Sequence, residues 1–289
     1  MLKCTFMTLY VFFMLAVSAV AGQEVISVYT TTPPVLDGIG DDVAWKSSPT
    51  VVTQDAVASI PIELQSIYTD TSIFMKVRFP DSTENRVHKL MNWDESTKTY
   101  RTGTLREDSL VLKWNMEPLP VDVSLQSETE YRADIWFWKS FRTDPLGYAD
   151  DKMHIYSFSK RNKAQDVILA NGKIMYLSRP SDSGKSSYQS IAYEKFMGDS
   201  VPRYRHRQPT GSRADIKAKG AWKEGFWTIE FQRDLMTNND DDIQFQTNIP
   251  SYFGVSRYEI AGKRPNPKLE QPNYESGDIS EVILLKFKK

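Results

Sequence analysis

The chain has 289 residues, and its 36 lysines and arginines nearly balance its 37 aspartates and glutamates. A formal net charge of −1 implies neither the basic surface of a nucleic-acid-binding protein nor a binder of polyanions. Tryptophan and tyrosine are frequent, which is usual in exported all-β domains and in proteins that stack flat ligands.

Residues 1–21 are typical of a secretory signal peptide. Lys3 supplies the positive charge, Phe6 to Val17 form a short apolar run, and Ala19-Val20-Ala21 fits the small-x-small cleavage pattern. We expect cleavage after Ala21 and a periplasmic or secreted protein. No later segment is long and apolar enough to span a membrane.

The only cysteine, Cys4, lies within that segment, so the mature chain would contain none. This excludes disulfides, iron–sulfur clusters, zinc sites built on thiolates and haem attached through a C-x-x-C-H motif. The mature chain must therefore be held together by its core.

Beyond the leader, the chain reads as short strands separated by turns. Residues 62–79 predict a hairpin that bends near 69–71, with alternate side chains buried from Ile73 to Phe79. Residues 107–116, 134–141 and 173–178 predict further strands. Residues 179–219 are rich in Ser, Gly, Pro, Arg and Lys, and we expect a long loop or lid there.

A second hairpin is predicted over 221–235, turning at Glu224-Gly225. Its second strand should bury Trp227, Ile229 and Phe231 and expose Thr228 and Glu230. Many strands at this spacing indicate an all-β, antiparallel β-sandwich with long loops, forming one domain over 22–289.

Enzyme motifs are missing from the sequence. "SGKSS" at 183–187 lacks the earlier glycine and the strand-to-helix context of a phosphate loop. His88, His154 and His206 lie too far apart for metal-ligand spacing, and each is expected on the surface or in a loop. Asp150-Asp151 and Asp240 to Asp242 are expected as solvated turn residues. Calcium binding there is the alternative, with no calcium-loop pattern behind it.

Three stretches carry a resemblance to known families. "PVLDGIGDDVAW" (34–45) and "GFWTIEFQRDL" (225–235) look like parts of the family 9 carbohydrate-binding modules and their relatives. "DIWFWKSFRTDPLGYADD" (134–151) resembles the haem-binding domain of the gamma subunit of ethylbenzene dehydrogenase and similar dimethylsulfoxide-reductase-type complexes. The resemblance runs from about Val28 to Phe287.

That resemblance implies a non-covalent b-type haem whose iron is bound by a methionine and a lysine. Met116 is the methionine candidate, because strand alternation places it on the face of Leu110, Leu112 and Trp114 at the strand's end; a core methionine is the alternative. Lys263 is the nearest match to the lysine, with Pro265 and Pro267 departing from the family pattern. Lys139 and His154 remain rivals, and a lysine must lose its proton to bind iron.

The aromatic stretch has several interpretations. Trp136 and Trp138 fall on one face of a strand, where they could wall a macrocycle or a sugar ring, or simply be core. Lys139 and Arg142 could pair with haem propionates, or be plain surface charges.

Together these features predict an exported, non-catalytic haem b protein that transfers electrons as a subunit or partner of a molybdenum-type oxidoreductase or another redox enzyme. A carbohydrate-binding module or surface-glycan protein without cofactor is the alternative. A third possibility is a domain that has kept this fold and lost its haem.

Overall fold

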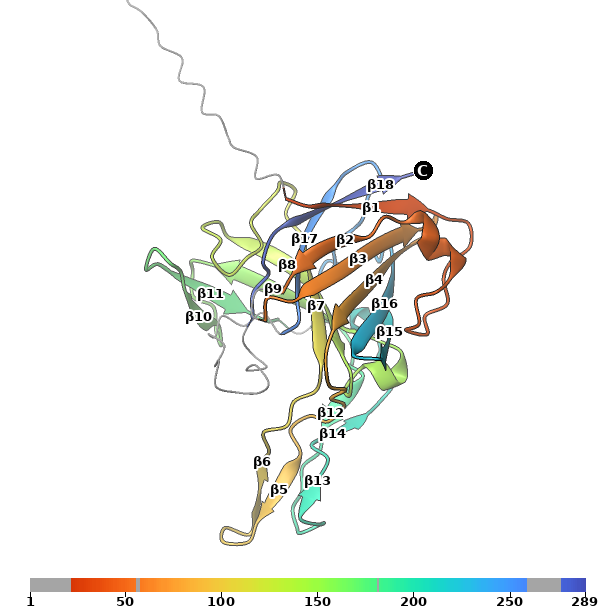
Figure 1. The fold of residues 1–289 in the computed structure, drawn as a ribbon. Coiled ribbons are helices and arrows are strands. Elements are labelled where there is room, and N and C mark those ends of the chain that lie inside the picture. The colour runs from red at the N-terminus through yellow and green to blue at the C-terminus, as the bar shows by residue number, and fades with distance from the viewer. Residues whose placement is uncertain (1–21, 56–57, 181, 259–276) are drawn as a thin grey trace, which may run out of the picture.

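A computed structural model describes residues 22–55, 58–180, 182–258 and 277–289 (Figure 1). Strands dominate this part of the chain, and its helical pieces are three short 3₁₀ helices: η1 (Val43–Ser47), η2 (Asp144–Leu146) and η3 (Ser212–Ala214). Within the described ranges, no helix has the length and apolar character that crossing a membrane requires.

One continuous sheet of thirteen strands forms the body of the protein. In spatial order its strands are β10 (Gln165–Ile168), β11 (Ile174–Ser178), β9 (Asp150–Ser157), β8 (Tyr131–Lys139), β7 (Ser109–Asn115), β17 (Ser251–Ser256), β18 (Ile283–Lys288), β1 (Glu24–Tyr29), β3 (Pro61–Tyr68), β4 (Ser72–Pro80), β16 (Phe226–Asp234) and β15 (Lys217–Lys223), with β2 (Val51–Gln54) beside β3.

The sheet curls on itself, so that β7 and β8 face β4, β16 and β15 across the main core (Figure 1). Trp138 of β8 and Trp227 of β16 meet edge to face in that core, with ring centroids 4.9 Å apart. β1 pairs in parallel with β18 and β3, and the other ladders of this sheet are antiparallel. The predicted all-β sandwich is confirmed.

Both predicted hairpins are present. β3 and β4 pair antiparallel across residues 69–71, and Ile73, Met75, Val77 and Phe79 are buried in the main core. β15 and β16 turn at Glu224 and Gly225, whose φ angles of 51° and 81° are the positive values that a two-residue type I′ turn requires.

The prediction that Glu230 is exposed is wrong. Its side chain is buried, and it accepts hydrogen bonds from Trp45 Nε1 (2.8 Å) and from the backbone amide of Gly38 (2.9 Å). The cause is a distant segment: η1 lies over this face of the sheet, where Trp45 packs with Ile67 and Phe74. Strand β16 is therefore covered on both faces at Glu230, and the carboxylate of Glu230 accepts hydrogen bonds inside the protein.

A second core covers the outer face of β7, β8 and β9. It joins apolar side chains of these strands to β10, β11 and the segment after β7, and its members include Val111, Val123, Leu125, Ile135, Phe137, Met175 and Ile279. Because both faces of β7 and β8 are covered, their polar side chains other than Arg132 are buried as well.

An arm of short strands projects from the sandwich (Figure 1). It contains β5 (Met91–Asp94), β6 (Thr99–Thr102) and β13 (Ser200–Val201), beside the pair β12 (Tyr188–Ser190) and β14 (Tyr204–His206). The span 179–219, expected as a long loop or lid, therefore holds β12 to β14, η3 and the start of β15. β13 pairs with β5, an upstream partner that local composition does not reveal.

Candidate functional site

Met116 follows β7 directly and lines an open cavity of about 460 Å³. The apolar part of its wall consists of Met116, Pro118, Leu119, Ile243, Ile249, Pro250 and Tyr252. Leu119 and Ile249 are 71% and 48% exposed, so apolar surface remains at the rim. We call this space the Met116 cavity.

Local hydrogen bonds fix the position of Met116. Its amide donates to the carbonyl of Arg132 (3.1 Å), which extends the β7–β8 ladder by one step. The Asn115 side chain then closes the following turn, accepting from the amide of Glu117 (3.0 Å) and donating to the carbonyl of Leu119 (2.9 Å). Leu110, Leu112 and Trp114 lie in the main core, and Met116 is half-buried against it, as the strand alternation predicts.

The register of β7 and β8 separates Lys139 from Met116. Ser109 pairs with Lys139, and Asn115 pairs with Ala133, so the two side chains stand at opposite ends of the ladder. Six residues of strand span about 20 Å. One iron atom therefore cannot be bound by both Met116 and Lys139.

His154 is excluded as a partner of Met116 by the face on which it lies. It pairs with Ala133 in β8, which in turn pairs with Asn115, so these three residues share the outer face of the sheet. Met116, one residue further on, packs against the inner core. Lys263, the favoured lysine, lies outside the described residues, and its role stays a prediction.

Of the three histidines expected on the surface or in a loop, only His154, which lies in β9, departs from that expectation; His88 lies in a loop, although it is buried. His154 is buried next to Tyr156, and His88 is buried beside Glu107, whereas His206 is exposed and contacts the Phe141 carbonyl. Both buried histidines are covered by segments distant in sequence, so local polarity is a poor guide to their burial.

Trp136 and Trp138 are core residues. Neither has exposed surface, and neither lines the Met116 cavity. Trp136 packs against Trp114 and Phe245, and the six-membered ring of Trp138 lies so close to Gly220 that a side chain there would meet it. The core alternative is therefore the one the structure supports, and neither indole offers a face to a sugar.

Lys139 and Arg142 are not surface charges. Lys139 Nζ lies 2.6 Å from Asp150 Oδ2, and Arg142 pairs with Glu107, which also accepts the amide of Arg142 (2.8 Å). All four side chains are buried. Because each cation already has an internal carboxylate, neither is available as a simple propionate partner.

The prediction that the aspartates are solvated turn residues is also wrong for three of them. Asp150 and Asp151 begin β9 and are buried, and Asp242 is buried as well. Burial by itself raises the pKa of Asp150, but the charges of Lys139, Lys152 and Arg213 hold that pKa below its ordinary value. Asp150 is thus an ionised internal anchor rather than a turn residue.

Strand β7 also contains a buried lysine, which the sequence pattern did not predict. Lys113 of β7 has no exposed surface, and its Nζ lies 2.8 Å from Tyr131 Oη and 4.0 Å from the centre of the Tyr156 ring. Burial lowers its pKa to about 7, although the nearby carboxylates of Asp278 and Asp122 act in the opposite direction. It lies on the outer face, so it does not join Met116.

A larger cavity, of about 620 Å³, lies near the opposite end of β7, and its wall mixes apolar side chains with charged ones. Its wall includes Asp81, Asp108, Arg257 and Tyr258. Burial and the charge of Asp81 raise the pKa of Asp108 to about 6. No methionine, histidine or lysine of the described chain lines it, so it offers haem iron neither of the ligand types that the resemblance implies.

The Met116 cavity fits one side of a b-type haem. A thioether is an established axial ligand, and apolar walls suit the macrocycle. The described residues of its wall include no imidazole or amine, so a second strong ligand would come from outside the described ranges. Arg132, at the same wall, offers a cation, although it also pairs with Glu117 (3.1 Å).

The fold and this cavity define a β-sandwich with an open, partly apolar cavity at the end of strand β7. The sequence pattern of the family described as ethylbenzene dehydrogenase matches residues 40–264. The chain belongs to that family, and the resemblance seen in the sequence is confirmed.

Two solved structures are similar to this one, both of a family 9 carbohydrate binding module from Caldicellulosiruptor kristjanssonii. The complex with cellotriose is 11% identical, with 92% of this chain and 95% of that chain covered and a TM-score of 0.37. For the complex with glucose the values are 10%, 91%, 97% and 0.37. At these scores the likeness supports no inference about ligands. No curated protein matches the chain.

Proposed function

We propose that this protein binds haem b non-covalently in the Met116 cavity and transfers electrons as a subunit or partner of a redox enzyme of the molybdenum type. Membership of the ethylbenzene dehydrogenase family supports the class of function. The observation that carries the proposal is the half-buried thioether of Met116 in a partly apolar, open cavity.

Bound haem would supply reversible one-electron chemistry. The chain's part is to hold and tune it. Met116 would face the iron, the apolar wall around Ile243 and Tyr252 would exclude water, and Arg132 would lie near enough to the cavity to meet a propionate. Lys263 is the proposed second ligand. Residues 1–21 would direct export to the periplasm or beyond, and cleavage would leave one mature domain.

The residues that supported sugar binding, the paired tryptophans, are not available to a ligand. Trp136 and Trp138 are both enclosed by the core. We therefore propose the haem function alone, and oligosaccharide binding becomes an outcome of its test.

The test is a hemin titration of the mature protein, followed by difference absorption. We expect one haem per chain, extractable into acidified organic solvent because no mature cysteine tethers it. Leu119→Asp at the rim should weaken binding by about tenfold, the equivalent of ~1.4 kcal/mol. Leu105→Asp, equally apolar and 51% exposed but outside this cavity, is the control. A protein that takes up no haem and binds oligosaccharides by calorimetry would overturn the proposal.

A further inference from the structure

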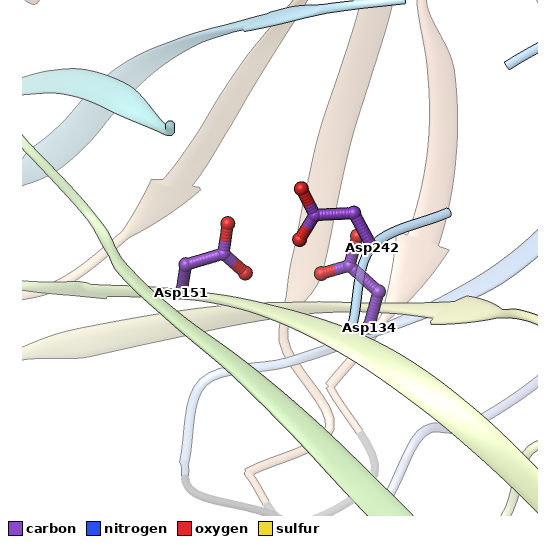
Figure 2. A group of neighbouring side chains, drawn as sticks. All are labelled: Asp134, Asp151 and Asp242. Atoms are coloured by element: carbon purple, nitrogen blue, oxygen red, sulfur yellow. The ribbon is translucent and has the colours of Figure 1, made fainter. Parts of the chain in front are cut away.

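Three buried aspartates converge inside the sandwich, next to the Met116 cavity. Asp134 comes from β8, Asp151 from β9 and Asp242 from the segment after β16. One carboxylate oxygen of each lies within 4.8 Å of the others, and all three residues are buried. Figure 2 shows the three carboxylates turned toward one another.

The ladder and one ion pair explain how they meet. Asp134 pairs with Trp114 and Asp151 pairs with Trp136, so both carboxylates point to the inner face. Arg233 of β16 crosses from the opposite layer to bind Asp134 and the carbonyl of Ile243. The amide of Ile243 also donates to Asp134 Oδ2 (3.1 Å), which brings the neighbouring Asp242 to the cluster.

Hydrogen bonds do not satisfy this group. Asp134 Oδ2 is occupied by Arg233 and Ile243, but Asp134 Oδ1 and both oxygens of Asp151 have no hydrogen-bond partner among the described residues. Asp151 has no exposed surface, and its carboxylate is aimed into the cluster (Figure 2). Burying a carboxylate without a hydrogen-bond donor costs free energy of folding. The presence of such a group at Asp151 therefore indicates a positively charged partner that would offset this cost.

The charge count points the same way. Three carboxylates face the single guanidinium of Arg233, which leaves two negative charges uncompensated. Burial and the charges of Asp134 and Asp242 raise the pKa of Asp151. Either protons or a cation must supply the balance, and a divalent cation matches it in both charge and position.

We infer that Asp134, Asp151 and Asp242 bind a divalent cation of the Ca²⁺ type. Carboxylate oxygens without cysteine or histidine suit a hard cation, and Ca²⁺–oxygen bonds of about 2.3–2.6 Å let one ion bridge atoms this far apart. Mg²⁺, with bonds of about 2.0–2.1 Å and strict octahedral geometry, spans the group less well. Asp242 also lines the Met116 cavity, which gives water and ions a route to the site.

The cation has a structural role in this arrangement. It ties β8 and β9 to the segment that carries Ile243, and Ile243 is part of the Met116 cavity wall. The inference stands without haem, because it rests on the aspartates alone. Loss of the ion should loosen the 235–245 segment before it affects the rest of the sandwich.

The test uses the full mature protein, dialysed against a chelator and titrated with Ca²⁺ by calorimetry. We expect one ion per chain and a higher Tm with Ca²⁺ than without it. Tb³⁺ is a second probe: Trp136 Nε1 lies 3.4 Å from Asp134 Oδ2, so excitation of tryptophan should sensitise Tb³⁺ emission that Ca²⁺ then quenches.

Asp151→Asn should weaken Ca²⁺ binding by about tenfold or more, whereas Asp166→Asn, an exposed carboxylate of β10, should leave it unchanged. If Asp151→Asn does not fold, the wild-type titrations decide. No calorimetric binding, no sensitised emission and an unchanged Tm would show that protons neutralise the cluster, and would overturn the inference. Equal affinity in Asp151→Asn would place any bound ion elsewhere, and would overturn it as well.

Discussion

The ammonium group of Lys139 lies 2.6 Å from Oδ2 of Asp150, and neither side chain has exposed surface. Tyr188 donates to the same oxygen of Asp150 (3.1 Å), and Arg213 pairs with the other one. The charged residues that follow the aromatic stretch of β8 therefore form an internal network. They join β8 and β9 to the elements beyond β11, so their first function is to hold the end of the sandwich.

Lys139→Met should lower the free energy of unfolding by about 3 kcal/mol, because it leaves Asp150 buried with one cation fewer. Urea denaturation at neutral pH measures the change. Lys160→Met is the matched control, because Lys160 forms an exposed pair with Asp166 whose loss should cost at most ~1 kcal/mol. Equal effects of the two substitutions would mean that Lys139 is not paired in solution.

Lys113 should make stability depend on pH. Its pKa in the folded protein, about 7, lies below its ordinary value of 10.5, so the unfolded chain binds more protons between these values. The cost of burying the charge is fully present below pH 7 and declines as the pH rises, so the free energy of unfolding should increase from pH 7 toward pH 10.

The measurement is urea denaturation of wild type and Lys113→Met across that pH range. Other titrating groups cancel in the difference between the two proteins. The variant should be the more stable one at pH 7, and its advantage should shrink with rising pH. Parallel stability curves would contradict a depressed pKa at Lys113.

Gly220→Ala should destabilise the sandwich, because a methyl group there would lie 2.5 Å from the Trp138 ring. Crowding of this kind in a packed core costs about 1–3 kcal/mol. A double-mutant cycle with Trp138→Phe, monitored by thermal unfolding, isolates the contact. In the Phe background the alanine should be tolerated better, and a strictly additive result would show that the two residues do not meet.

The regular part of the fold could be predicted from the sequence. The period-two pattern from Ile73 to Phe79 and the Glu224-Gly225 turn depend on neighbours along the chain, so each specifies its hairpin locally. The position of Met116 at the end of β7 and the core face shared by Trp136 and Trp138 follow from the same alternation.

Buried polar residues could not be predicted in this way. Glu230 is covered by η1, which lies far earlier in the chain. Lys113 is covered by the outer core, which brings the segment after β7, strands β10 and β11, and Ile279 to the outer face of the sheet. The three converging aspartates are separated in sequence and meet only when β8, β9 and the 235–245 segment assemble. The residues that cover these polar groups come from distant parts of the sequence. The alternation of apolar and polar residues along one strand does not reveal them.

The coordination of iron by Met116 tests the central claim most directly. The ferric, hemin-loaded protein should be low-spin and show the near-infrared charge-transfer band of thioether-ligated haem by magnetic circular dichroism. Met116→Ala should lose that band while Met197→Ala, an exposed methionine near the arm, keeps it. A hemin-loaded wild type without sulfur ligation, or a band that persists in Met116→Ala, would contradict the assignment of haem to the Met116 cavity.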